Sequence, residues 1–142
     1  MPSVTRFYRI DEANALVPEL RKVVGLLSHQ REELVRLRDA LVERRRAVEA
    51  GGGGSNRPER DPEVRTIELR IRGLVDQMQA GVAWLDQRGI VLRDIPTGLV
   101  DFPALVAGRQ VWLCWRLGED RVDWWHELTA GVAGRRPLIE LE

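Results

Sequence analysis

"LVPELRKVVGLLSHQREELVRLRDALVERRRAV", residues 16–48, is the stretch that decides the fold, because its apolar residues recur in alternating steps of four and three. The recurring positions are Leu16, Leu20, Val23, Leu27, Leu34, Leu37, Leu41 and Val48, with Gln30 and Arg44 as interruptions. A repeat of about 3.5 residues keeps one seam of a helix facing a partner helix, as in a coiled coil. We predict helix one over residues 11–50, with Asp11 as its N-cap and a kink or break near Pro18.

The same spacing resumes after a glycine-rich segment, residues 51–61, which we predict to be a flexible loop. A phosphate-binding loop would need a strand before the glycines, whereas here a helix precedes them. The second series is Val64, Ile67, Ile71, Leu74, Met78 and Leu85, with Gly81 at the one small position. It predicts helix two over residues 62–88, ended by Gly89. The short loop requires the two helices to pack antiparallel.

The remaining residues, 90–142, change to β-branched and aromatic residues separated by Gly and Pro, which is typical of short strands. Residues 108–128 resemble a β-hairpin that turns at residues 118–120. If Leu117 pairs with Arg121, one face of this hairpin carries Trp112, Cys114, Trp124 and His126. A slip of one residue would change that set, and the sequence leaves the register open.

Apolar residues beside the seam are concentrated at the start of helix one and the end of helix two, where they widen the apolar stripe. They are Val17, Val24, Val75, Val82 and Trp84. These ends lie together in an antiparallel hairpin and need a cover, which only the C-terminal third can provide. We therefore predict one α+β domain, residues 1–142. It is a long antiparallel two-helix coiled-coil hairpin, capped at its base by a small tryptophan-rich antiparallel β-structure.

The overall charge argues against a nucleic-acid-binding protein, because the 22 basic and 22 acidic residues cancel. A single cysteine suits a reducing compartment. We find no apolar run long enough for a signal peptide or a membrane span. The sequence predicts a cytoplasmic protein without nucleic-acid or membrane partners.

The first candidate site is a metal site, because Cys114 and His126 are both ligands of zinc or iron. The acidic residues that could complete it are Glu127, Glu119 and Asp101. Neither a CxxC pair nor an HExxH helix supports this interpretation, and packing alone also explains the tryptophan-rich strands.

Two other sites are conceivable in the same region. Cys114 is a candidate nucleophile with His126 as its base, although a thiol in the middle of a strand usually behaves as a small buried apolar group. A polar pocket is also conceivable, in which arginines hold carboxylates or an anionic ligand. Its members would be Asp101, Glu119, His126, Glu127, Arg135 and Arg136. His29 lies outside the seam and is expected to be exposed.

The functional class that the sequence favours is a non-catalytic interaction or regulatory protein. Two helical hairpins could join as a four-helix bundle, so a homodimer is expected, and the hairpin could also dock a protein partner. The alternative is a metal-binding protein, and conceivably an enzyme, with zinc or iron near His126.

Several segments together resemble the bacterial family known as domain of unknown function 2203. They are FYRIDEANALVPEL, GLVDFPAL, GRQVWLCWRLGED, WWHEL and GVAGRRPL. The resemblance implies no activity, but it places the family's recurrent polar residues at Glu12, Asn14, Asp101, Cys114, Glu119, His126 and Arg135. The chain departs from the family's usual opening at Arg9, where threonine or serine is more typical, and this leaves the position of the helix cap open.

Overall fold

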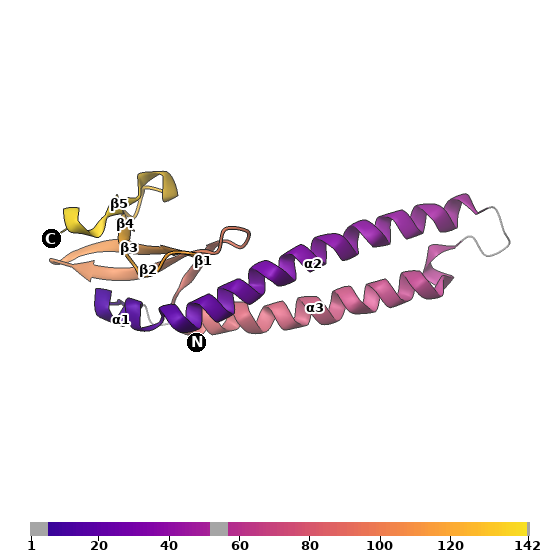
Figure 1. The fold of residues 1–142 in the computed structure, drawn as a ribbon, viewed down its shortest axis with the longest axis horizontal. Coiled ribbons are helices and arrows are strands. Elements are labelled where there is room, and N and C mark those ends of the chain that lie inside the picture. Colours follow the sequence, from indigo (N-terminus) through magenta and orange to yellow (C-terminus); the bar gives the residue numbers. More distant parts are fainter. Residues whose placement is uncertain (1–5, 52–56, 142) are drawn as a thin grey trace. The chain divides into compact units, whose positions relative to one another are not determined.

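The computed structural model describes residues 6–51 and 57–141, and these residues form two compact units. The first, here called the sheet unit, comprises the described residues of Met1–Ser28 and Gly81–Glu142. The second, here called the helical unit, is His29–Ala80. The chain has the predicted α+β class, with long helices followed by an antiparallel sheet (Figure 1).

The predicted first helix is divided in two, α1 (Ile10–Ala15) and α2 (Val17–Ala50). The break at Leu16 confirms the effect expected of Pro18, whose ring and missing N–H disfavour a continuous helix. The predicted cap at Asp11 is wrong. Arg9 is the N-cap of α1, and its backbone N–H donates to Glu12 Oε1 at 2.9 Å, while its own side chain makes no capping hydrogen bond.

The helical unit contains the C-terminal part of α2 and most of α3 (Pro62–Gln87), preceded by the short 3-10 turn η1 (Pro58–Arg60). The two helices run antiparallel, because Glu33 near the start of this part of α2 pairs with Arg70 of α3, whereas Arg44 near its end pairs with Glu63 at the start of α3. The predicted loop of residues 51–61 lies partly outside the described residues, and its last part contains η1.

Among the described residues of the helical unit, the buried side chains all occupy seam positions of the sequence pattern. They are Gln30, Leu37, Val64 and Leu74. Leu85, the last predicted seam residue of α3, is buried in the sheet unit. The helix ends at Gln87, and the expected stop is Gly89, which has φ +69° and allows Ile90 N–H to donate to Leu85 O at 3.0 Å.

The sheet has five antiparallel strands in sequence order. The strands are β1 (Val91–Asp94), β2 (Leu99–Val106), β3 (Arg109–Arg116), β4 (Trp124–His126) and β5 (Arg136–Pro137). Two further short 3-10 turns, η2 (Val132–Gly134) and η3 (Leu138–Glu140), flank β5.

One face of the sheet carries the apolar core of the sheet unit. Phe102 of β2 pairs with Leu113 of β3, which pairs with Trp125 of β4, and all three are buried. The Tyr8 ring contacts Phe102 edge-on at 5.1 Å, and Tyr8 forms a parallel bridge to Ala104. The N-terminal segment therefore pairs with the edge of β2 at Tyr8, whose ring packs on this face.

The opposite face carries Trp112, Cys114, Trp124 and His126, for which the sequence left the register of the two strands open. Trp112 pairs with His126 and Cys114 pairs with Trp124, so the four side chains share one face as predicted from the pairing of Leu117 with Arg121. The connection between β3 and β4 is longer than a tight turn and spans residues 117–123. In the described part of the chain, we find no helix with the length and apolar character needed to cross a bilayer.

Candidate metal centre

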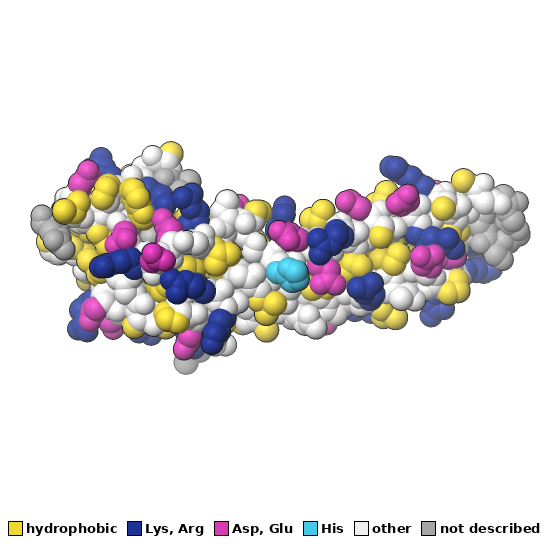
Figure 2. All heavy atoms as spheres, viewed as in Figure 1, with side chains coloured by type: hydrophobic (Ala, Val, Ile, Leu, Met, Phe, Trp, Pro, Cys, Tyr) yellow, Lys and Arg dark blue, Asp and Glu magenta, His cyan; other side chains and the backbone are white. Residues whose placement is uncertain are grey.

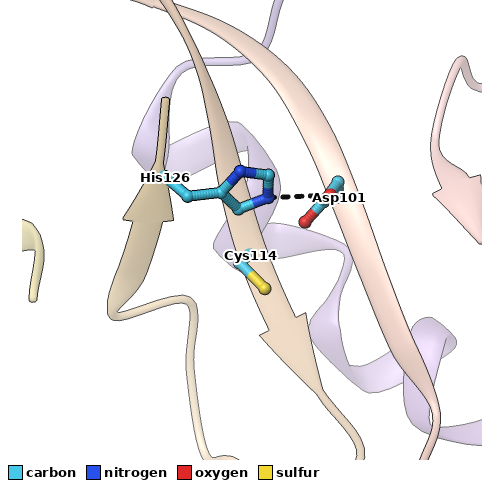
Figure 3. A group of neighbouring side chains, drawn as sticks. All are labelled: Asp101, Cys114 and His126. Carbon is cyan, nitrogen blue, oxygen red and sulfur yellow. Dashed lines mark hydrogen bonds and ion pairs between the residues drawn. The ribbon is translucent and has the colours of Figure 1, made fainter. Parts of the chain in front are cut away.

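Three buried side chains with metal-ligating atoms meet on this second face of the sheet. Asp101 comes from β2, Cys114 from β3 and His126 from β4, and all three project to the same side (Figure 3). Asp101 is directly opposite Cys114, and one ligand atom from each residue lies within 4.8 Å of the other two. The exposed fractions are 2% for Asp101, 0% for Cys114 and 4% for His126. We call these residues the Asp–Cys–His cluster.

The carboxylate of Asp101 is only partly satisfied. Its Oδ2 accepts a hydrogen bond from Arg93 Nε at 2.8 Å and lies 2.9 Å from His126 Nε2. Its Oδ1 is buried and has no hydrogen-bond partner among the described residues. A buried acceptor without a partner typically costs about 1–3 kcal/mol, so the cluster favours a hydrogen-bond donor or a cation near Oδ1.

The orientation of the His126 ring is set by the backbone. Nδ1 lies 2.9 Å from the carbonyl oxygen of Glu127, which can only accept, so Nδ1 carries a hydrogen. In the neutral ring, Nε2 then presents a lone pair to the Asp101 carboxylate, which is also an acceptor. A metal ion bound between Nε2 and Asp101 would remove this conflict. Metal-bound histidines commonly donate their second ring N–H to a carbonyl in this way.

Cys114 is poorly suited to act as a free nucleophile. Burial raises the pKa of its thiol to about 12, and the neighbouring Asp101 carboxylate acts in the same direction. Nucleophilic cysteines need a lowered pKa, because the thiolate is the reactive form. A metal ion, by contrast, binds the thiolate directly and displaces its proton.

Comparison with known families gives one match. The model of a family described as "Uncharacterized conserved protein (DUF2203)" matches residues 6–138. The chain belongs to this family. No curated protein and no solved structure matches it. The resemblance indicated by the sequence is therefore confirmed, and the DUF2203 match includes all three residues of the Asp–Cys–His cluster.

The other two predicted ligands of this DUF2203 chain lie outside the cluster. Glu119 accepts hydrogen bonds from the Arg135 side chain and from the Arg116 backbone N–H, each at 2.7 Å. Glu127 pairs with Arg109 at 2.6 Å and is 40% exposed. Of the three acidic candidates, the fold brings only Asp101 to Cys114 and His126.

The predicted polar pocket is only partly formed. Asp101 and His126 adjoin each other, and Arg135 stacks over Trp124 at 4.9 Å while pairing with Glu119. Arg136 lies over Trp125, 5.6 Å from the ring centre. The Nε of Arg135 is buried and lacks a hydrogen-bond partner in the described structure. Glu119 and Arg135 therefore form a pair beside the cluster, and the Arg135 guanidinium lies close enough to Cys114 to oppose the rise in the pKa of its thiol.

The remaining polar residues named by the DUF2203 resemblance, Glu12 and Asn14, have structural roles. Glu12 accepts from the N-cap of α1, and Asn14 Oδ1 accepts from Val122 N–H at 2.7 Å. Asn14 thus ties α1 to the connection that leads into β4. His29 is exposed, as expected.

Arg93 is the cluster neighbour that sequence reasoning missed. It lies at an irregularity between β1 and β2, where the pairing shifts between Leu92 and Asp94. Such bulges redirect a side chain, and Arg93 reaches Asp101 while covering the Trp112 ring at 4.9 Å. The motif "VLRDIP" contains no signal for this pairing, because bulges depend on the neighbouring strand.

A cavity of about 610 Å³ opens beside the cluster. Asp101 and His126 form part of its wall, together with residues from β1, the β1–β2 turn and the segment after β4. This volume is in the range of ordinary small-molecule sites.

Proposed function

We propose that this protein binds a zinc or iron(II) ion through Asp101, Cys114 and His126. The observation that carries the proposal is the convergence of three buried ligand atoms within 4.8 Å, with Asp101 Oδ1 lacking a hydrogen-bond partner among the described residues. Imidazole nitrogen, thiolate sulfur and carboxylate oxygen form a ligand set suited to either metal.

The geometry needs little rearrangement. Ligand distances of about 2.0–2.3 Å in a tetrahedral site separate neighbouring ligand atoms by roughly 3.3–3.5 Å. His126 Nε2 and Asp101 Oδ2 are 2.9 Å apart, so a small outward movement would admit the ion. The hydrogen bond from His126 Nδ1 to the Glu127 carbonyl already holds the ring with Nε2 toward the carboxylate.

Three protein ligands leave one tetrahedral position for water or another molecule, which distinguishes reactive zinc sites from closed structural ones. The cavity beside Asp101 and His126 supplies space for that position. The proposed ion would therefore keep one coordination position at which water and other small ligands exchange.

The test is metal analysis of tag-free protein purified without chelator and then equilibrated with Zn²⁺ and dialysed. We expect about one equivalent of zinc in the wild type and less than a fifth of that in His126→Ala and Cys114→Ala. His29→Ala is the matched control, because it removes the other histidine, which is exposed and in the helical unit.

Circular dichroism of each variant separates loss of ligand from loss of fold. Wild-type protein that retains neither zinc nor, after the same treatment with Fe²⁺ without oxygen, iron would contradict the proposal, as would folded His126→Ala and Cys114→Ala variants that retain a full equivalent.

A second candidate function is self-association of the helical unit as a non-catalytic interaction protein. Val35 and Val42 of α2 are seven residues apart and 42% and 48% exposed, and Leu69 of α3 is 64% exposed. Acidic and basic side chains are interspersed around apolar patches on the face drawn in Figure 2. Such mixed charge next to an apolar heptad stripe favours a second copy of the same helix pair.

In this proposal α2 and α3 form a coiled-coil hairpin whose base, within the sheet unit, is covered by the tryptophan-rich sheet. Support for the cover comes from Arg21 of α2, which donates to Asp120 O at 2.9 Å, and from Val24, which closely approaches Gly98.

Light scattering after size exclusion tests the association. We expect the wild type to be a dimer at tens of micromolar and the double variant Val35→Glu/Val42→Glu to be a monomer. The control is Leu105→Glu, which changes an exposed apolar residue of β2 and should remain a dimer. A monomeric wild type, or a double variant that stays dimeric, would exclude self-association.

A further inference from the structure

The cavity beside the Asp–Cys–His cluster has a cationic side that the metal proposal does not use. Arg93 and Arg116 both line it. Arg93 is engaged with Asp101, whereas none of the ion pairs found between the described residues involves the Arg116 side chain. Only the backbone of Arg116 is held, through its N–H to Glu119 Oε1 at 2.7 Å. Its guanidinium is therefore available to a ligand.

The acidic residue of the same wall is already engaged. Asp94 Oδ2 accepts hydrogen bonds from both the backbone N–H and the hydroxyl of Thr97, at 3.0 and 2.5 Å. With a divalent ion bound, the Cys114 thiolate and the Asp101 carboxylate would balance its charge. The two positive charges of Arg93 and Arg116 then exceed the one negative charge of Asp94. The wall therefore has a net positive charge, which suits an anion.

The rest of the wall is suited to a small organic molecule. Leu99, Leu128 and Ala130 contribute apolar surface, and Thr129 contributes a hydroxyl. Small-molecule sites typically combine such apolar walls with a few polar groups that fix the orientation of the ligand.

We propose that this cavity binds a small organic oxyanion, a carboxylate or a phosphate ester, between Arg116 and the open coordination position of the metal. The inference rests on the proposed metal site. The Arg116 guanidinium would donate two hydrogen bonds to two oxygens of the anionic group. The body of the ligand would lie against Leu99 and Leu128, and a second polar group would reach the ion beside His126. Binding involves no covalent step.

The test uses calorimetric titration of the full-length, zinc-loaded protein with butyrate, 4-hydroxybutyrate and phenyl phosphate, and with neutral butyramide as a control. We expect at least one anion to bind and butyramide not to bind. Arg116→Gln should weaken anion binding on the order of tenfold to a hundredfold, because a charge-assisted contact is lost. Arg38→Gln, the same charge change in the helical unit, should leave the affinity unchanged.

Cobalt(II) replacing zinc adds a readout at the ion itself. The visible absorption of cobalt responds to its ligands, so bound 4-hydroxybutyrate, whose hydroxyl can reach the ion, should change that spectrum in wild type and, at the same concentration, much less in Arg116→Gln. The comparison of carboxylate with phosphate ester identifies which oxyanion the site prefers.

The outcomes separate the two proposals. If the protein binds one equivalent of zinc but none of the anions, the anion site is overturned and the metal site stands. The same holds if the Arg116→Gln variant binds the anions as tightly as wild type does. Binding of 4-hydroxybutyrate that leaves the cobalt spectrum unchanged also overturns the anion site, because the hydroxyl of this probe would not reach the ion. Protein that binds neither zinc nor iron(II) overturns the metal site and, with it, this inference.

Discussion

The protonation of the Cys114 thiol affects the stability of the metal-free protein. Folding raises the pKa of its thiol from an ordinary value near 9 to about 12. The unfolded chain therefore releases this proton at a lower pH than the folded chain does. The stabilisation that comes from this higher pKa of the folded state is fully present below about pH 9 and is lost as pH rises toward about 12.

We therefore predict that the stability advantage of wild type over Cys114→Ala, both with excess chelator, shrinks between pH 8 and pH 11. Urea unfolding at several pH values measures it, and the variant corrects for the other groups that titrate in the same range. Parallel stability curves for the two proteins would show that the thiol is not held protonated by the fold.

Among elements, α1 begins with an unusual residue. Arg9 is its N-cap, where its side chain makes no capping hydrogen bond, while Glu12 completes one half of a capping box. Arg9→Thr would supply the other half by accepting from the backbone N–H of Glu12. The exposed pair of Arg9 with Asp11 that would be lost contributes little.

We predict that Arg9→Thr raises the melting temperature by about 2–4 °C, as expected for an added cap in a chain of this size. Calorimetry measures the shift, and Arg9→Ala, which removes the same ion pair without adding a cap, is the control. Equal melting temperatures for Arg9→Thr and Arg9→Ala would contradict this account of the cap.

The turn between β1 and β2 depends on the absence of a side chain at Gly98. This residue has φ +68°, and a Cβ there would lie 2.6 Å from Leu117 Cβ and 2.9 Å from Val24 Cγ1. We predict that Gly98→Ala lowers the free energy of unfolding by about 2–5 kcal/mol, from backbone strain together with overpacking.

Gly108→Ala is the matched control for that substitution. Gly108 has φ +76°, but a Cβ there would have no atom within 4 Å apart from those of its immediate chain neighbours. Its variant should lose only about 1–2 kcal/mol, from backbone strain alone. Similar losses in both variants under urea unfolding would mean that the contacts of Gly98 with Leu117 and Val24 are not tight.

Local patterns predicted the elements well, and long-range pairing limited the prediction of the site. The heptads located the helices, and the alternation of residues around Trp112 and Trp124 gave the face shared by Cys114 and His126. Nothing near these residues indicated that Asp101, rather than Glu119 or Glu127, would join them. That choice is made by the register of β2 on β3, which the sequence of either strand alone does not specify.

For the whole molecule, the two compact units should respond differently to metal. The Asp–Cys–His cluster lies entirely in the sheet unit, and the helical unit contributes none of its residues. A ligand that binds only the folded state raises the cost of opening the region that holds it.

We predict that Zn²⁺ slows hydrogen exchange at backbone amides of β2, β3 and β4 by at least tenfold and changes exchange in His29–Ala80 by less than twofold. Exchange measured by mass spectrometry with and without zinc tests this, and His126→Ala supplies the control. Equal slowing in both units would indicate that metal binding and the helix pair are coupled.

The pairing of β3 with β4 also gives the cluster its own optical reporters. Trp112 is the cross-strand partner of His126, and Trp124 is the partner of Cys114. Indole emission responds to nearby charge and polarity, so an ion entering between Cys114 and His126 should alter the intrinsic fluorescence without any added label. Many metals and small anions could then be screened on the unmodified protein by measuring its tryptophan fluorescence.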